Sequence, residues 1–487
     1  MPATPRSLLS WLLPLLLFLI LSHTPADPDM WWHLRNGQEM AQQRAILLED
    51  RFSYTRYGAP WVNVFWLPDL ILYGLYRVAG FFGLGLVTAA LGAALFTHIW
   101  KTRPRAPFLS AFLVILAAIA IAPFWSVRPQ LASFLLLAWL AERIETWRRS
   151  PSRPFWLPLL FLLWANLHGG FIWGFLYLLA FLFGEFLERR LQPETSLPPR
   201  SLLELSFWAF LSIPTTLVNP NGLALWQLPF HTVDVSMGIY EWLSPDFHKP
   251  FLHPVLWMLF LYLLGLSLRR APVRLSQTLP ILGFAYMGFV SQRALAAFLL
   301  LLAPSLLEIW EEIGKAWRSS RPELPANLGL LPRPWLIALN ATLVIGLGLG
   351  ALVRAWALAS PEAVHRDYPH GAIAWLRQNR PPGRLFNSYN WGGYLTFNLP
   401  EYPVFIDGRA DLYGEELIHQ WQQIVQATPQ AWELLQKWQV QIVLLEPDQP
   451  LVKALIERGW KIAYQDQTSI LLLPEQSHAH LPLHPSH

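Results

Sequence analysis

The chain has 487 residues, of which 54% are hydrophobic and 14% charged, whereas a typical soluble domain carries about 25% charged residues. This composition excludes a water-soluble globule. The formal net charge of +4 is too small to indicate nucleic-acid binding in a chain of this length. The absence of cysteine excludes disulfides and thiolate metal sites.

Eleven apolar blocks follow one another along the chain. They cover residues 7–22, 81–100, 106–124, 130–147, 155–167, 170–187, 202–218, 251–268, 276–290, 294–313 and 335–354. A helix needs about 20 apolar residues to cross about 30 Å of hydrocarbon. We therefore predict a polytopic α-helical membrane protein with about eleven transmembrane helices. Residues 155–167 are short for a span, so this block and the next, divided by His168-Gly169-Gly170, could instead form a broken pair that lines a cavity.

Basic clusters between the blocks predict the orientation in the cell membrane. A cytoplasmic N-terminus places every cluster on the cytoplasmic side, as the positive-inside rule requires. The first block is then a retained anchor, although Arg6 and Ala26 leave a cleaved signal peptide as an alternative.

The same reading divides the chain into parts. Residues 1–22 form the first transmembrane helix, 23–80 the first extracytoplasmic loop with an interface helix over 64–79, 81–354 the helical bundle, 355–474 an extracytoplasmic α/β domain, and 475–487 a disordered, His-containing tail.

The C-terminal part has the composition of a soluble α/β domain. We predict a helix over 367–379, strands at GRLFNSY, PVFIDGR and VQIVLLEP, helices over 414–427, 429–438 and 449–458, and two short strands within 461–473. The continuous apolar run of VQIVLLEP is typical of a buried parallel strand.

The first loop opens with acidic and aromatic residues, DPDMWWHLRNGQ. Asp27 and Asp29 follow the first span directly, where a partly shielded carboxylate can act as a general base or a metal ligand. If this segment is helical, Asp29 and His33 share a face, and the Trp31-Trp32 pair either stacks on a sugar or anchors at the interface. An ordinary interfacial loop with aromatic anchors is the alternative.

Three basic residues are predicted at the outer ends of spans: Arg128, His168 and Arg293. Charged groups at such depth line polar cavities more often than they face lipid, and guanidinium forks bind phosphate oxygens. We expect them to bind a lipid phosphate; pairing with carboxylates or snorkelling to headgroups is the alternative. Glu241 lies in the loop after the seventh span. Its carboxylate either assists a hydroxyl group or a metal ion, or it is an ordinary solvated side chain.

Two polar segments follow predicted strands of the C-terminal domain, NSYNWGGYL and FIDGRADLYG. Ligand crevices form at such positions in open α/β sheets. The second segment carries Asp407, Arg409 and Asp411, which are read either as a binding loop or as a salt-bridged structural loop.

The architecture resembles the GT-C superfamily of integral-membrane glycosyltransferases, which includes the catalytic subunit of oligosaccharyltransferases and the protein mannosyltransferases. In the first loop, Asp29, Trp31 and Arg35 match the spacing of an Asp, a Trp two residues later and an Arg six residues later in that subunit. EDRFSYTRYGAPW is similar to the continuation of the loop, and NSYNWGGYL to a WWDYG-type motif. Asn390 stands where that motif has an acid, which argues against recognition of a peptide sequon.

The resemblance implies transfer of a sugar from a polyprenyl-phosphate donor to an unidentified glycan, lipid or protein acceptor at the outer face of the cell envelope membrane. Asp29 matches the carboxylate that activates the acceptor, with Asp27 as a second candidate. The phosphate would leave towards Arg128 and Arg293, with His168 beside them. The remaining substrate-binding candidates are Trp31, Trp32, His33, Arg35, Glu241 and Asn390. Metal dependence varies within the superfamily, so Mg²⁺ or Mn²⁺ is compatible with this reading.

Two other classes stay open. A transporter or flippase of lipid-linked sugars would carry charges near the bilayer midplane and inverted repeats; Glu185 and Glu204, near span ends, keep this alternative open, although most acids fall at the outer face. A non-catalytic membrane scaffold is the third class. The glycosyltransferase reading requires Asp29, Arg128 and Arg293 to meet in one outward-facing pocket.

Overall fold

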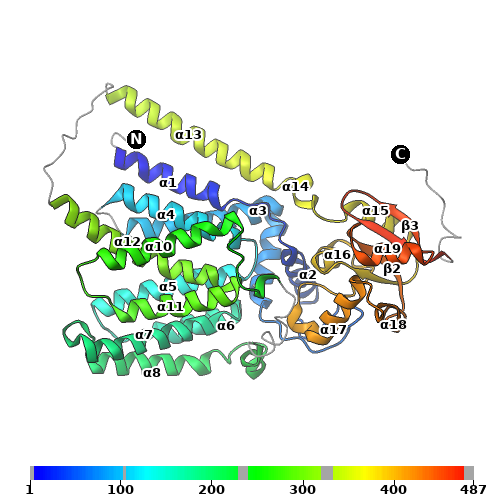
Figure 1. The fold of residues 1–487 in the computed structure, drawn as a ribbon, viewed down its shortest axis with the longest axis horizontal. Coiled ribbons are helices and arrows are strands. Elements are labelled where there is room, and N and C mark those ends of the chain that lie inside the picture. Colours follow the sequence, from blue (N-terminus) through cyan, green and yellow to red (C-terminus); the bar gives the residue numbers. More distant parts are fainter. Residues whose placement is uncertain (1–4, 103–105, 229–239, 320–332, 476–487) are drawn as a thin grey trace. The chain divides into compact units, whose positions relative to one another are not determined.

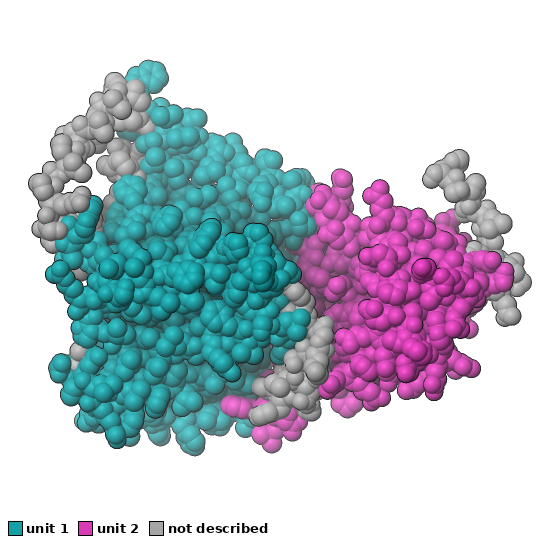
Figure 2. All heavy atoms as spheres, in the orientation of Figure 1, with its two compact units in different colours: residues 1–24, 81–218, 239–359 teal, residues 25–80, 219–238, 360–487 magenta. Residues whose placement is uncertain are grey.

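The computed structural model describes residues 5–102, 106–228, 240–319 and 333–475. Nearly all of the predicted C-terminal tail, residues 476–487, therefore lies outside the described residues. The chain divides into two compact units (Figure 2). Unit 1 comprises residues 1–24, 81–218 and 239–359, and unit 2 comprises residues 25–80, 219–238 and 360–487.

Unit 1 is built from helices (Figure 1), and each of the predicted apolar blocks coincides with one of them. They are α1 (Pro5–Leu21), the second part of α3 (Trp66–Lys101), α4 (Pro107–Ile121), α5 (Gln130–Arg149), α6 (Trp156–Leu167), α7 (Phe171–Leu191), α8 (Pro199–Thr215), α10 (His253–Leu268), α11 (Leu275–Val290), α12 (Leu295–Ser319) and α13 (Arg333–Leu358). Helix α12 packs against α4, α5, α10 and α11, so it lies at the centre of the bundle.

Length and apolar composition qualify six helices of the described ranges as membrane spans. They are Trp66–Lys101, Pro107–Phe124, Phe171–Leu191, Pro250–Leu268, Gln292–Trp317 and Ile337–Leu358. Ser7–Leu21, Trp156–Leu167 and Leu275–Val290 are apolar but shorter. The prediction of a helical membrane protein is confirmed, whereas the count of about eleven spans stays a prediction.

Helix α3 joins the two units and bends at one residue. Gly80 has φ 58° and ψ −156°, which interrupts the helix between the predicted interface segment and the following span. A residue with a Cβ tolerates this backbone conformation poorly, so glycine suits the position. The first part of α3 belongs to unit 2 and the second part to unit 1.

Unit 2 contains a four-stranded sheet with the order β1-β2-β4-β3. The strands β1 (Arg384–Asn387) and β2 (Val440–Leu445) are parallel, as predicted for the apolar run of β2. The strand β4 (Ile470–Leu473) is antiparallel to both β2 and β3 (Lys461–Gln465). The helices of this part are α14 (Pro361–His365), α15 (His370–Asn379), α16 (Gly392–Asn398), α17 (Ala410–Val425), α18 (Ala431–Lys437) and α19 (Pro450–Glu457).

The predicted strand at PVFIDGR is wrong. Only Val404 pairs, in an isolated bridge with Ser53 of the first loop. Beyond it, the Asn387 side chain occupies the backbone groups that a strand would use: its Nδ2 donates to the carbonyl of Ile406 (2.8 Å) and its Oδ1 accepts from the N–H of Phe405 (2.8 Å). A side-chain amide thus replaces a neighbouring strand.

Candidate active site

Asp27 and Asp29 lie at the start of helix α2 (Pro28–Gln43). The Asp27 side chain is the N-cap and accepts from the N–H of Asp29 (2.9 Å), and Pro28 occupies the first turn. Both features are strong helix starts, which explains why DMWWHLR is helical. Asp27 therefore has a structural task, whereas the Asp29 carboxylate sits at the positive end of the helix dipole, which favours a negative charge.

Asp29 contacts Trp32. Its Oδ1 accepts a hydrogen bond from the indole Nε1 of Trp32 at 3.1 Å. The backbone of Gly408, between β1 and α17, lies against the same carboxylate oxygen. The structure thus places one predicted substrate-binding residue, Trp32, directly on the predicted base.

His33 turns to a different partner. It is 3% exposed, and its Nδ1 lies 2.7 Å from an oxygen of Asp69 in the first part of α3. Asn36 donates to the other oxygen of Asp69 (2.6 Å). Sequence reasoning missed Asp69 as a site neighbour; the signal was an acid in an apolar segment, which needs a polar partner once it is buried. These residues join α2 to α3.

The other candidates of the first loop occupy different surroundings. Trp31 is fully buried and packs its ring edge-on against Tyr394 and Tyr368, with centroids 4.7 and 5.4 Å away. Arg35 pairs with Glu39 on the same helix at 3.0 Å. Asn390 is exposed in the 3₁₀ turn Tyr389–Trp391.

In unit 1 the structure brings together Arg128, Glu241 and Arg293. Arg128 Nη1 donates to Glu241 at 2.7 Å, and the Arg293 guanidinium lies over the ring of Trp242, 5.0 Å from its centroid. Burial raises the pKa of Glu241, but the charges of Arg128 and Arg293 outweigh this effect and leave the pKa below its usual value. Two positive charges therefore surround one carboxylate.

His168 lies between α6 and α7, beside this group. Its Nδ1 accepts from the N–H of Gly170 (2.8 Å) and lies 2.8 Å from Ser133 Oγ. Because Nδ1 is an acceptor, the neutral ring carries its proton on Nε2. Burial and then the charge of Arg293 lower the pKa of His168, which favours the neutral ring.

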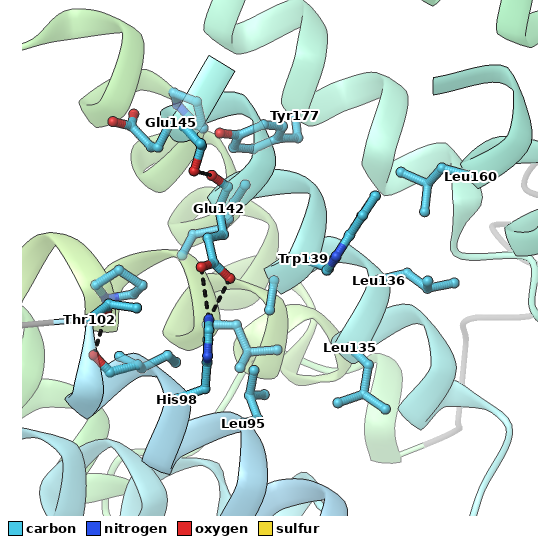
Figure 3. Close-up of a pocket in the computed structure, with 18 of the residues that line it drawn as sticks. Leu95, His98, Thr102, Leu135, Leu136, Trp139, Glu142, Glu145, Leu160 and Tyr177 are labelled. Carbon is cyan, nitrogen blue, oxygen red and sulfur yellow. Dashed lines mark hydrogen bonds and ion pairs between the residues drawn. The ribbon is translucent and has the colours of Figure 1, made fainter. Parts of the chain in front are cut away.

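A cavity of about 1070 Å³ lies in unit 1 between α3, α5, α6, α11 and α12 (Figure 3). Leucines form much of its wall: Leu91, Leu95, Leu135, Leu136, Leu159, Leu160, Leu163, Leu300 and Leu301. Near the C-terminal ends of α3 and α5 the lining becomes polar, where His98 Nε2 lies 2.8 Å from Glu142. We call this cavity the leucine groove.

The predicted phosphate-binding residues, Arg128, Arg293 and His168, are not among the residues that line the leucine groove. Its wall begins at Leu135 and Leu300, seven residues after Arg128 and Arg293, and its last α6 residue, Leu163, lies five residues before His168. The leucine groove and the basic cluster thus both belong to unit 1, and they have no residue in common.

No cluster of three or more His, Asp or Glu side chains in the described part of the chain is arranged to hold a metal ion. Involvement of Mg²⁺ or Mn²⁺ stays a prediction.

The solved structure of the archaeal oligosaccharyltransferase AglB from Archaeoglobus fulgidus, in complex with an inhibitory peptide and a dolichol-phosphate, has a TM-score of 0.52 to this chain at 12% identity. The similarity covers 97% of this chain and 74% of that one. This chain has the GT-C fold. At this identity the likeness establishes the GT-C fold alone.

ArnT from Cupriavidus metallidurans bound to undecaprenyl phosphate has a TM-score of 0.45 at 14% identity, over 95% of this chain and 96% of that one. Its apo state has a TM-score of 0.49 at 12% identity, over 94% and 95%. No family model and no curated protein sequence matches the chain.

One cluster of charged side chains connects the first loop to the C-terminal segment. Arg409 is fully buried, and its Nη2 lies 2.7 Å from both Asp50 and Asp407. Trp61 Nε1 donates to Asp411 at 3.3 Å. The salt-bridged reading of this segment is therefore confirmed. We call Asp50, Asp407 and Arg409 the arginine clamp. Sequence reasoning missed Asp50, because its partners lie far away in the chain.

Proposed function

We propose that this protein is a membrane glycosyltransferase that transfers a sugar from a polyprenyl-phosphate-linked donor to an acceptor at the outer face of the membrane. The observation that carries the proposal is the basic cluster of Arg128, Arg293 and His168 in unit 1, in a chain with the GT-C fold. The AglB structure is in complex with a dolichol-phosphate, a lipid that combines a phosphate with a long apolar chain.

The negatively charged phosphate of such a donor is complementary to the two guanidinium groups in the cluster of Arg128, Arg293 and Glu241. Among the described residues of this cluster, two guanidinium groups lie near one carboxylate, and the ring of His168 lies near Arg293. Guanidinium groups bind phosphate oxygens through paired hydrogen bonds. They also stabilise a phosphate leaving group as its charge develops.

The proposed reaction is a displacement at the sugar carbon that carries the phosphate. The acceptor oxygen forms a bond to this carbon, the carbon–oxygen bond to the phosphate breaks, and the phosphate keeps the electron pair. We assign the acceptor proton to the carboxylate of Asp29, which lies in the first turn of α2. The acceptor and the sugar are not specified by these residues.

We expect Arg128→Ala and Arg293→Ala to weaken donor use. Hydrogen bonds to charged groups contribute about 1.5–3 kcal/mol, so kcat/KM should fall by about 10- to 100-fold in each variant. The measurement is transfer from a radiolabelled polyprenyl-phosphate sugar by the purified protein. Arg51→Ala, which removes an exposed arginine paired with Glu49, is the control and should leave donor use unchanged. Unaltered donor affinity in both test variants would dismiss the phosphate site.

A second prediction concerns the isoprenoid chain. Leu136→Trp fills part of the leucine groove, so it should raise KM for a long-chain donor by about tenfold, since each displaced CH₂ costs about 0.8 kcal/mol. A donor with one or two isoprene units should be unaffected. Leu179→Trp, on α7 at a side chain that is 66% exposed, is the matched control. Equal KM values for both chain lengths would mean that the chain binds elsewhere.

The acids that suggest a transporter have structural partners. Arg148 Nε lies 2.5 Å from Glu185, and Arg153 Nε lies 3.5 Å from Glu204. Both acids are thus ion-paired within unit 1, and the glycosyltransferase is the function that we propose.

A further inference from the structure

We propose that Gly408 is a positioning residue for the Asp29 carboxylate, so that the C-terminal segment of unit 2 sets the orientation of the base. The inference rests on the proposed function, which assigns the acceptor proton to Asp29. It gives the FIDGRADLYG segment a task in sugar transfer.

Gly408 has no room for a side chain. A Cβ at this position would lie 2.0 Å from Asp29 Oδ1 and 3.0 Å from Trp32 Nε1. Such a distance is far inside van der Waals contact, so any side chain here must displace the carboxylate. Gly408 has no positive φ, so its backbone conformation does not require glycine. The requirement comes from the carboxylate that lies against it.

Asp29 Oδ1 is contacted from two sides. The indole N–H of Trp32 donates to this oxygen at 3.1 Å, and the bare backbone of Gly408 lies against it. A carboxylate that can rotate samples many orientations, whereas one oxygen held in this way fixes the plane of the group. Preorganisation of this kind removes the cost of ordering the base during the reaction.

Buried ion pairs hold the backbone on both sides of Gly408. Its two neighbours, Asp407 and Arg409, belong to the arginine clamp, and the N–H of Arg409 also donates to Asp407 Oδ1 at 3.0 Å. The clamp is fully buried and includes Asp50 of the first loop. It therefore ties the Gly408 backbone to the loop that carries Asp29.

A second glycine contacts the same helix but differs from Gly408 in what it touches. A Cβ at Gly393 would lie 2.7 Å from the backbone oxygen of Pro28 and 3.2 Å from the backbone nitrogen of Trp32. Substitution there must move the helix. At Gly408 the nearest atom is the end of a side chain, which can rotate away. Gly408→Ala therefore changes the carboxylate and leaves the helix in place.

The test compares Gly408→Ala with Gly74→Ala, a position on α3 where an added Cβ meets no atom within 4 Å. A misplacement of about 1 Å costs about 100-fold in rate. We expect Gly408→Ala to lower kcat by about this factor, with KM for the donor and the thermal midpoint unchanged. Gly74→Ala should keep the kcat of the unmodified protein. A purely structural role for Gly408 would instead lower the thermal midpoint together with kcat.

Trp32→Phe provides a second route, because it removes the indole N–H and adds no volume. We expect it to lower kcat, and we expect Trp32→Phe combined with Gly408→Ala to lose little more than Gly408→Ala alone, since both changes release one oxygen. If Gly408→Ala fails to fold, the kcat of Trp32→Phe tests the inference instead. An unchanged kcat in Trp32→Phe then overturns it. Unchanged kcat in Gly408→Ala also overturns it. Retained turnover in Asp29→Asn would instead show that Asp29 is not the base. Failure of the proposed function is therefore distinguishable from failure of the inference about Gly408.

Discussion

Asp29→Asn should abolish sugar transfer while expression and membrane insertion stay normal. The amide has the shape of the carboxylate and its oxygen still accepts from Trp32 Nε1, but it cannot take a proton. General-base catalysis contributes about 10²–10⁴-fold, and we expect kcat to fall by that factor. The measurement is single-turnover formation of product from a radiolabelled polyprenyl-phosphate sugar.

Asp27→Asn is the matched control for this experiment. Asn is as good an N-cap as Asp, so α2 keeps its start and the variant should retain most of its turnover. Loss in Asp27→Asn with retention in Asp29→Asn would transfer the role of base to Asp27. Full activity in both variants would leave the first loop without a base.

The helices of unit 1 could be predicted because their signal is local. An apolar block near 20 residues long has few other structures available in a membrane protein, and every predicted block coincides with a helix. The strand β2 was predictable for a similar reason, since its continuous apolar run is buried almost throughout. The start of α2 was encoded by Asp27-Pro28. Each of these signals lies within the segment that it describes.

The failures involve partners that are distant in the chain. PVFIDGR has the composition of a strand, but the Asn387 side chain takes its backbone groups, and nothing within the segment encodes that contact. Asp29 and His33 share a helix face as expected from their spacing. Nevertheless His33 turns to Asp69, because a buried carboxylate costs free energy until it is hydrogen-bonded.

The candidate site shows the same division. Their predicted places at the outer ends of spans identified Arg128 and Arg293 as guanidinium groups that need partners, and left phosphate and carboxylate partners open. The structure supplies Glu241 to Arg128 and Trp242 to Arg293. Which carboxylate meets which arginine depends on how α5 and α12 pack, and no single segment contains that information. Asp50 of the arginine clamp was not predicted as a site residue for the same reason.

Arg409→Met should destabilise unit 2 severely. Arg409 is fully buried and lies 2.7 Å from two buried carboxylates, Asp50 and Asp407. Removing one partner of a buried ion pair costs about 3–5 kcal/mol because it leaves uncompensated charge, and here two carboxylates lose their shared cation. The measurement is the protease sensitivity of residues 360–475 in the full-length protein during heating, which should appear at a lower temperature than in the unmodified protein.

Two further variants separate charge from packing. Arg51→Ala breaks an exposed ion pair with Glu49, which contributes about 0–1 kcal/mol, and should leave the transition unchanged. Asp50→Asn and Asp407→Asn added to Arg409→Met remove all three charges, so this triple variant should recover much of the lost stability, because the cost arises from unpaired buried charge. A triple variant as unstable as Arg409→Met would mean that stacking of the guanidinium on Phe52 and Trp61 holds the clamp together. Since the clamp flanks Gly408, its recovery should also restore sugar transfer, and the two measurements together connect the fold of unit 2 to the position of the base.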